Sequence, residues 1–239
     1  MISYVFKRYE LKYLLSGAQA EAILRAVTAR LSPDAYGETT VQSLYYDTAD
    51  DRIIRASLEK PIYKEKLRLR SYGLCPAGGT VFLEMKRKCG DVVYKRRLAL
   101  PENEVADVLE GRVPDSQIGR EIAYFLSFYP DLRAKVLILS DRSAWLDPGS
   151  DLRVTFDRNV RFRTDALDCR AALTGEPLLP PGCVVMECKS GLSFPLWLTH
   201  LLCAENARKT SFSKYGAAYE TLHRAASLEK TQNKGDCYV

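Results

Sequence analysis

Along most of the chain, hydrophobic and polar residues alternate with a period of two, the pattern of β-strands that bury one face. The expected strands are Val5–Leu14, Val41–Asp47, Tyr63–Tyr72, Thr80–Lys88, Val92–Leu100, Lys135–Leu146, Asp151–Arg163 and Val184–Ser190. Turn-forming residues separate several neighbouring strands, for example at Pro76–Gly79 and Asp147–Ser150. Such short connections favour antiparallel pairing, because parallel strands need long crossovers.

Fewer segments have helical periodicity. The expected helices are Ser16–Leu31, Pro101–Glu110, Ser116–Phe128, Pro195–Glu205 and Tyr215–Leu228. Ser16 and Gln19 form a capping box at the start of the first helix. The acidic run Asp47–Asp51 falls at a turn, where its carboxylates are expected to cap a following helix. No repeat or linker is evident, so we expect one domain over residues 1–229 and a flexible tail over 230–239.

One face of the predicted sheet is ionic rather than merely polar. On the strand Asp151–Arg163 the alternation assigns to this face Asp151, Arg153, Thr155, Asp157, Asn159, Arg161 and Arg163, with Arg158 as the one break. Other strands add Arg8, Glu10, Lys12, Lys64, Lys66, Arg68, Arg70, Glu84, Lys86, Lys88, Lys95, Arg97, Glu187 and Lys189. Lys and Arg outnumber Asp and Glu here, and like charges on neighbouring strands destabilise a sheet. The face therefore indicates a highly charged anionic ligand, such as a tri- or polyphosphate, whose oxygens suit the planar donors of Arg.

Two other interpretations of this face remain open. A solvated outer face of an antiparallel sheet accounts for any single strand. DNA is a weaker candidate, because 35 Lys and Arg against 30 Asp and Glu leave a net charge of only +5. Spacing alone does not distinguish a closed tunnel from an open basic surface.

Composition excludes several other classes of protein. The chain has 239 residues, and its 46% hydrophobic content can bury a full-sized core. Its longest apolar stretch, near Phe194–Ala204, is broken by polar residues and is shorter than the roughly 20 residues of a membrane span. The basic start of the chain is unlike a secretory signal, and the seven cysteines contain no Cys-x-x-Cys, so we expect reduced thiols in a cytoplasmic protein.

The sequence also limits the available chemistry. Two histidines leave little from which to build a Ser-His-Asp triad or a histidine metal site, and no glycine-rich phosphate loop occurs. A metal would therefore be held by carboxylate oxygens, which favours Mg²⁺ or Mn²⁺.

A series of short motifs resembles a known family. In chain order the motifs are Arg8–Tyr13, Ser43–Thr48, Lys66–Arg70, Leu83–Lys86, Asp141–Ala144, Leu152–Asp157, Met186–Lys189 and Ser211–Tyr215. Together they resemble the polyphosphate polymerase domain of the vacuolar transporter chaperone (VTC) family. This domain is part of the triphosphate tunnel metalloenzyme, or CYTH-like, superfamily. The resemblance extends from about Tyr4 to Tyr219.

The resemblance implies both a fold and an activity. The fold is α+β, a closed antiparallel barrel of about eight strands that forms a tunnel, with helices packed outside. The activity is transfer of the γ-phosphoryl group of ATP to a growing inorganic polyphosphate chain, with Mn²⁺ or Mg²⁺ as cofactor and ADP as product. ATP and polyphosphate are then the partners, and no nucleic acid is expected. A membrane-protein partner for product export and the oligomeric state are left open.

The family resemblance and the alternation of charged residues along the strands together predict the site residues. Catalytic contacts are expected from Arg68, Arg70, Lys86, Arg142 and Lys189. Substrate binding is expected from Lys12, Lys66, Lys95, Arg97, Arg153, Ser213 and Lys214. Of these, Arg142, Ser213 and Lys214 are nominated by the resemblance alone. Glu187 is the implied metal ligand, with Glu10 and Glu84 as further candidates.

The sequence departs from the superfamily at its first motif. Other tunnel enzymes begin with Glu-x-Glu-x-Lys, whereas here Arg8 precedes Glu10 and Lys12, which favours the polymerase branch over the triphosphatase branch. The phosphate-sensing domain and membrane helices of eukaryotic family members do not occur in this sequence. A polymerase needs no general base, because the attacking terminal phosphate is already an anion. A tri- or polyphosphatase of the same fold and a non-catalytic polyphosphate or nucleotide sensor remain as alternatives.

Overall fold

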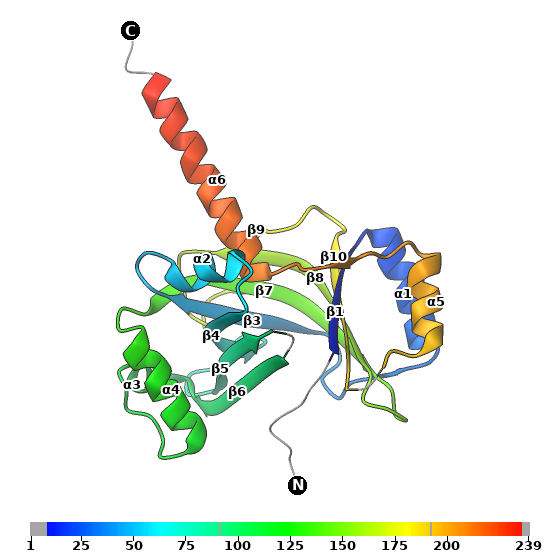
Figure 1. Cartoon of the computed structure of the whole chain (residues 1–239), viewed down its shortest axis with the longest axis horizontal. Helices are drawn as coiled ribbons and strands as arrows, with labels where there is room; N and C mark the ends of the chain where they lie inside the picture. Colours follow the sequence, from blue (N-terminus) through cyan, green and yellow to red (C-terminus); the bar gives the residue numbers. More distant parts are fainter. Residues whose placement is uncertain (1–8, 91, 192, 236–239) are drawn as a thin grey trace.

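The computed structural model describes residues 9–90, 92–191 and 193–235, and its centre is one curled antiparallel sheet (Figure 1). The long strands are β1 (Tyr9–Leu15), β3 (Thr39–Asp47), β4 (Tyr63–Tyr72), β5 (Thr80–Cys89), β6 (Val92–Pro101), β7 (Arg133–Leu146), β8 (Arg153–Arg163) and β10 (Val184–Ser190). The short strands are β2 (Ser32–Pro33), β9 (Glu176–Pro177) and β11 (Lys209–Thr210). Each predicted strand is confirmed, apart from the part of Val5–Leu14 before residue 9, which lies outside the described residues.

The helices lie around this sheet. They are α1 (Gly17–Thr28), α2 (Arg52–Leu58), η1 (Glu102–Glu104) with α3 (Val105–Leu109), α4 (Gln117–Phe128), α5 (Leu196–Ala204) and α6 (Lys214–Gly235). The predicted capping box is confirmed, since Ser16 and Gln19 exchange side-chain-to-backbone hydrogen bonds. Asp47 caps α2, because its two carboxylate oxygens accept from the backbone N–H groups of Ile53 and Ile54. In Figure 1, α6 projects away from the body, and it continues to Gly235, beyond the expected end at Leu228.

The sheet curls strongly. Its strand order is β11-β1-β10-β8-β7-β3-β4-β5-β6, so β1 and β5 are separated by six strand spacings. A flat sheet would hold them about 29 Å apart. Instead the Nζ atom of Lys86 on β5 lies 3.4 Å from Oε2 of Glu10 on β1. The ionic face is therefore the concave, inner face of the sheet, which we call the groove.

The expected closure of the barrel is not found among the described residues. The hydrogen-bonded path ends at β6 on one side and at β11 and β1 on the other, and no pairing of residues 9–90, 92–191 and 193–235 joins them. Strand β6 carries Lys95, Arg96 and Arg97 in sequence and ends at Pro101. Charges and proline at a sheet edge oppose further strand pairing, which accounts for an open edge here.

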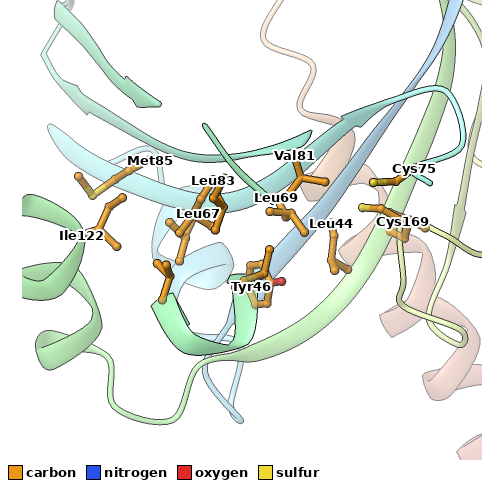
Figure 2. Close-up of a cluster of buried hydrophobic side chains, with 14 of the residues drawn as sticks. Leu44, Tyr46, Leu67, Leu69, Cys75, Val81, Leu83, Met85, Ile122 and Cys169 are labelled. Atoms are coloured by element: carbon orange, nitrogen blue, oxygen red, sulfur yellow. The ribbon is translucent and has the colours of Figure 1, made fainter. Parts of the chain in front are cut away.

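The hydrophobic core lies mainly on the convex side of the sheet. One cluster, drawn in Figure 2, packs Leu67 of β4 and Leu83 and Met85 of β5 against Ile122 of α4. A second packs β1, β8 and β10 against α1 and α5, which lie side by side in Figure 1. This burial of alternate residues fixes which side chains face the groove.

A third apolar cluster, which we call the plug, fills one end of the groove itself. It consists of Tyr45, Ile54, Val136, Ile138, Val160, Phe162, Val185, Tyr215 and Ala218, each less than 9% exposed. Helices α2 and α6 supply Ile54, Tyr215 and Ala218 and cover this end. The groove is thus polar in its centre and apolar beneath α6.

Candidate functional site

The groove gathers the charged side chains that alternate along the strands. Its cations are Lys12, Lys64, Lys66, Arg68, Arg70, Lys86, Lys88, Lys95, Arg97, Arg142, Arg153, Lys189 and Lys214. Its carboxylates are Glu10, Glu84, Asp157 and Glu187. Cations outnumber carboxylates, so the groove keeps an excess of positive charge.

Glu84 organises the wall formed by β4, β5 and β6. Its side chain is 1% exposed, and Oε2 accepts from Nε and Nη2 of Arg68 at 2.9 and 2.8 Å. Oε1 lies 2.7 Å from Lys95 Nζ and accepts from Arg97 Nε at 2.7 Å. Burial opposes ionisation of Glu84, but Arg68, Arg70 and Lys95 outweigh it and hold the pKa of this carboxyl well below its ordinary value. Both oxygens are therefore occupied in holding the surrounding cations in position.

Asp157 organises the opposite wall, where β7 and β8 pair. Arg142 donates from Nε and Nη2 to the two oxygens of Asp157, each at 2.6 Å, and Lys214 also binds Oδ2. Asp157 is fully buried, which disfavours its charge, yet Lys214 and Arg142 lower its pKa below the ordinary range. Because Lys214 is the first residue of α6, this ion pair ties the start of that helix to the groove.

Two carboxylates, Glu10 and Glu187, meet where β1 pairs with β10. Lys12 Nζ lies between them, 3.5 Å from Glu10 Oε1 and 3.4 Å from Glu187 Oε1. The outer oxygens pair with Lys86 at 3.4 Å and with Lys189 at 3.0 Å. Burial opposes ionisation, but Lys189 and Lys12 hold the pKa of Glu187 well below its usual value, and Lys86 lowers that of Glu10. Both side chains therefore remain carboxylates near neutral pH.

This pair fits a divalent cation of the kind that shares its ligands with phosphate. Among the described residues no group of three or more His, Cys, Asp or Glu side chains could enclose a metal. Mg²⁺ is usually held by one or two carboxylates, with phosphate oxygens and water completing the shell. Glu10 and Glu187 would supply those carboxylates, at the place where the Lys12 ammonium now balances their charge. Glu84 is the poorer candidate of the three, because four cations already surround it.

The segment before α6 lies in the groove and contacts both β1 and β4. Lys12 donates to the backbone oxygen of Phe212 at 3.3 Å, and Lys66 donates to Ser213 Oγ at 3.0 Å. Tyr215 stacks on Tyr45, with ring centroids 4.7 Å apart. Burial lowers the pKa of Lys66 to about 8, reinforced by nearby Lys12 and Lys86. Ser213 and Lys214, which the resemblance alone nominated, thus lie beside residues that the alternation nominated.

Several buried polar atoms of the groove have no hydrogen-bond partner. Within the described part of the chain, Arg70 Nε, Arg153 Nε and Thr155 Oγ1 are buried without a hydrogen bond. Arg70 Nε is nearest to Glu84 Oε2, at 3.7 Å. Buried donors are normally satisfied, so these atoms are available to an incoming acceptor such as a phosphate oxygen. Arg153 lies toward the margin, where Nη2 binds Asp34 Oδ2 at 2.9 Å.

Three residues expected on the ionic face, Asn159, Arg161 and Arg163, are directed elsewhere. The register of β7 and β8 shifts between Leu139 and Asp141, and Asn159 has φ +47°. This bulge reverses the alternation, so Val160 and Phe162 enter the plug. Arg161 and Arg163 turn away from the groove, to Asp141 and to backbone carbonyls of residues 166–174 respectively. The strict alternation predicted for this strand is therefore wrong beyond Arg158.

The groove also contains tyrosines, which the alternation of charged residues did not predict. Arg68 Nη1 donates to the hydroxyl of Tyr45 at 3.1 Å, and Arg97 Nη2 donates to that of Tyr72 at 3.1 Å. Burial opposes ionisation of Tyr45, but Arg68 and Lys66 lower its pKa to about 8. Its position opposite Arg68 in the β3–β4 register was the signal that could have placed it here.

The curled antiparallel sheet with its cation-rich concave face is the fold of a VTC domain. The model of the VTC domain family matches residues 7–223, and the chain belongs to this family. No curated protein sequence matches the chain.

Several solved structures share this fold. A candidate adenylate cyclase from Bacillus halodurans has a TM-score of 0.54 at 12% identity, covering 87% of this chain and 94% of its own. A Hippeastrum protein, described as a candidate adenylyl cyclase with a dominant triphosphatase activity, has a TM-score of 0.54 at 14% identity, covering 90% and 95%. A candidate adenylate cyclase from Vibrio parahaemolyticus has a TM-score of 0.50 at 11% identity, covering 91% and 99%. At these identities the likeness shows the fold alone.

Among the residues that the structure describes, no helix combines the length and the apolar character needed to cross a bilayer.

Proposed function

We propose that this protein is an ATP-dependent polyphosphate polymerase that transfers the γ-phosphoryl group of ATP to a growing polyphosphate chain in the groove. The observation that carries the proposal is the excess of cations on the concave face, combined with buried donors such as Arg70 Nε that have no hydrogen-bond partner in the described structure. Clustered cations repel one another and destabilise a folded protein unless an anion lies among them. A chain of condensed phosphates supplies a high density of negative charge and would balance these cations.

Positioning and charge stabilisation account for most of phosphoryl-transfer catalysis. Arg68, Arg70 and Arg142 would bind and orient the phosphate oxygens, because guanidinium groups present paired donors in a fixed plane. Glu84 and Asp157 hold Arg68 and Arg142 in place before substrate arrives. Lys86 and Lys189 lie on either side of Glu10 and Glu187, where they add positive charge next to the proposed metal ligands.

Glu10 and Glu187 are the side chains that would hold Mn²⁺ or Mg²⁺. Such an ion, when bound, supplies Lewis-acid stabilisation of charge on phosphate oxygens. The attacking group is the terminal phosphate of the chain, which is an anion and needs no general base. The carboxylates support this assignment, because cations keep the pKa of Asp157 and Glu187 low and make both poor proton acceptors.

A triphosphatase that uses water as acceptor is the second candidate. The Hippeastrum neighbour, described by its triphosphatase activity, favours it, as does the pair of carboxylates Glu10 and Glu187. An assay with γ-labelled ATP and Mn²⁺ distinguishes the two. The polymerase proposal predicts labelled polymer with an equivalent amount of ADP. Labelled orthophosphate without polymer would establish hydrolysis, and stabilisation by polyphosphate without turnover would indicate a sensor.

A further inference from the structure

Two cysteines from distant parts of the chain lie next to each other on the convex side of the sheet. Cys75 is in the turn between β4 and β5, and Cys169 is in the loop that follows β8. The backbone N–H of Cys75 donates to the carbonyl of Cys169 at 3.1 Å, and Figure 2 shows both side chains in the same apolar cluster. Both are free thiols, 4% and 2% exposed. The fold thus joins two thiols whose positions in the chain are separated by β5, β6, β7 and β8.

Neighbouring side chains hold this contact in place. Gln42 of β3 is fully buried and donates from Nε2 to the backbone oxygens of Gly73 and Cys169, each at 2.8 Å. Arg163 donates to carbonyls of the second loop, including that of Asp168 at 3.2 Å. Residues joined by backbone hydrogen bonds across strands have Cα atoms about 5.5 Å apart, and disulfides span about 4.4–6.8 Å. The backbone contact therefore holds the two cysteines within bridging distance.

We propose that Cys75 and Cys169 form an intramolecular disulfide on exposure to hydrogen peroxide, and that this bond locks the β4–β5 turn to the loop after β8. The peroxide oxidises one thiol to a sulfenic acid and is itself reduced, which releases one water. The second sulfur then attacks the first, so that the S–S bond forms and the S–O bond breaks. The hydroxyl group leaves as a second water with the proton of the second thiol. Two thiols and one peroxide thus give one disulfide and two waters.

Cys75 is the thiol that we expect to react first. Its neighbours Leu74 and Pro76 are exposed, so a local opening of this turn brings the Cys75 sulfur into contact with solvent. Burial raises the pKa of both thiols, that of Cys169 to about 12, and nearby Cys75 adds to this shift. Since the thiolate is the reactive form, the bond forms slowly. Once formed, it is buried and resists reduction, unlike the exposed disulfide of a fast redox sensor.

The disulfide changes stability rather than the charges of the groove. It encloses β5, β6, β7 and β8 in one covalent ring. A cross-link restricts the unfolded chain more than the folded one, and the effect increases with the length of the ring. The oxidised protein therefore resists unfolding better than the reduced protein.

The test combines peptide mapping with thermal melts. The native protein is incubated with a small excess of hydrogen peroxide for several hours, and catalase then removes the peroxide. Free thiols are alkylated in denaturant, and mass spectrometry of a non-reduced digest identifies linked peptides. Melts are recorded before oxidation, after oxidation and after reduction with a phosphine. Cys75→Ala/Cys169→Ala removes the pair, and Cys89→Ala/Cys203→Ala, which removes two exposed thiols, is the matched control.

The wild-type protein and the Cys89→Ala/Cys203→Ala control should yield a linked Cys75–Cys169 peptide, lighter than the two reduced peptides by two hydrogen atoms. Their melting temperatures should rise by about 5 °C or more on oxidation and fall back on reduction. The variant without the pair should show neither change.

Two results would overturn the proposal. One is that Cys75 and Cys169 are still alkylated as free thiols, or are linked to other cysteines, when Cys89 and Cys203 are fully oxidised. The other is a linked pair without a rise in melting temperature. Mapping of the wild-type protein decides the matter even where the variant without the pair fails to fold, and no measurement depends on phosphoryl transfer.

Discussion

Arg142 and Asp157 face each other across the β7–β8 pairing and are joined by two hydrogen bonds of 2.6 Å, Nε to Oδ1 and Nη2 to Oδ2. The carboxylate also binds Lys214, so a single buried acid holds one arginine of the groove and the first residue of α6. Asp157 therefore links the stability of the fold to the geometry of the proposed site.

Replacing Asp157 with Asn should destabilise the protein. The change leaves two buried cations, Arg142 and Lys214, without their counter-charge, and breaking a buried pair in this way costs about 3 kcal/mol or more. Urea denaturation measures the loss. Asp115→Asn is the control, because Asp115 is 96% exposed and its pair with Arg120 should contribute less than about 1 kcal/mol. Equal stabilities of the two variants would show that Arg142 and Lys214 find solvent or other partners.

Arg70→Ala and Lys189→Ala should each lower turnover by about 10²-fold, since each removes a donor aimed at developing charge. Folding should be retained, because Glu84 keeps Arg68, Lys95 and Arg97, and Glu187 keeps Lys12. Initial rates with ATP, together with melting temperatures, provide the measurement. Arg120→Ala, at an exposed pair on α4, is the control. Near-normal activity of either groove variant would remove that residue from the site.

Glu187→Gln should weaken Mn²⁺ binding by about tenfold or more, because an amide oxygen lacks the charge that a hard divalent cation prefers. The readout is water-proton relaxation by Mn²⁺ in the presence of tripolyphosphate, which does not depend on turnover. Glu59→Gln, an exposed residue after α2, is the matched control. Unchanged Mn²⁺ affinity in Glu187→Gln would place the metal elsewhere.

Tripolyphosphate affinity should fall as pH rises from about 6.5 to 9. Burial lowers the pKa of Lys95 to about 7 and that of Lys66 to about 8, so both lose positive charge in this window. Ionisation of Tyr45, whose pKa is about 8, adds negative charge and acts in the same direction. Titrations across this range test the trend, and Lys66→Arg should flatten it, because guanidinium stays protonated. Affinity that is constant or increases with pH would contradict these assignments.

The sequence allowed much of the fold to be predicted, because alternation on long antiparallel strands specifies which side chains share a face. It placed Lys66, Arg68, Glu84 and Lys189 on one surface, and the structure brings that surface to the inside of the sheet. Local capping signals were equally informative, as the bonds from Ser16 and Asp47 show.

The alternation of hydrophobic and polar residues could not predict features that depend on a local irregularity of a strand or on contacts between distant segments. The bulge at Asn159 reverses the faces of β8, and only the tolerance of Asn for positive φ hinted at it. The plug is built from β3, β7, β8, β10, α2 and α6, whose apolar residues look like ordinary core in sequence. The open edge at β6 likewise depends on strand order, which short turns do not determine.

The most direct test is a crystal structure with Mn²⁺ and a non-hydrolysable ATP analogue. We predict phosphate density in the groove, contacted by Arg68, Arg70 and Arg142, with the anomalous signal of manganese beside Glu187. Phosphates bound on the convex side of the sheet, or a groove occupied only by its own ion pairs at saturating ligand, would contradict it.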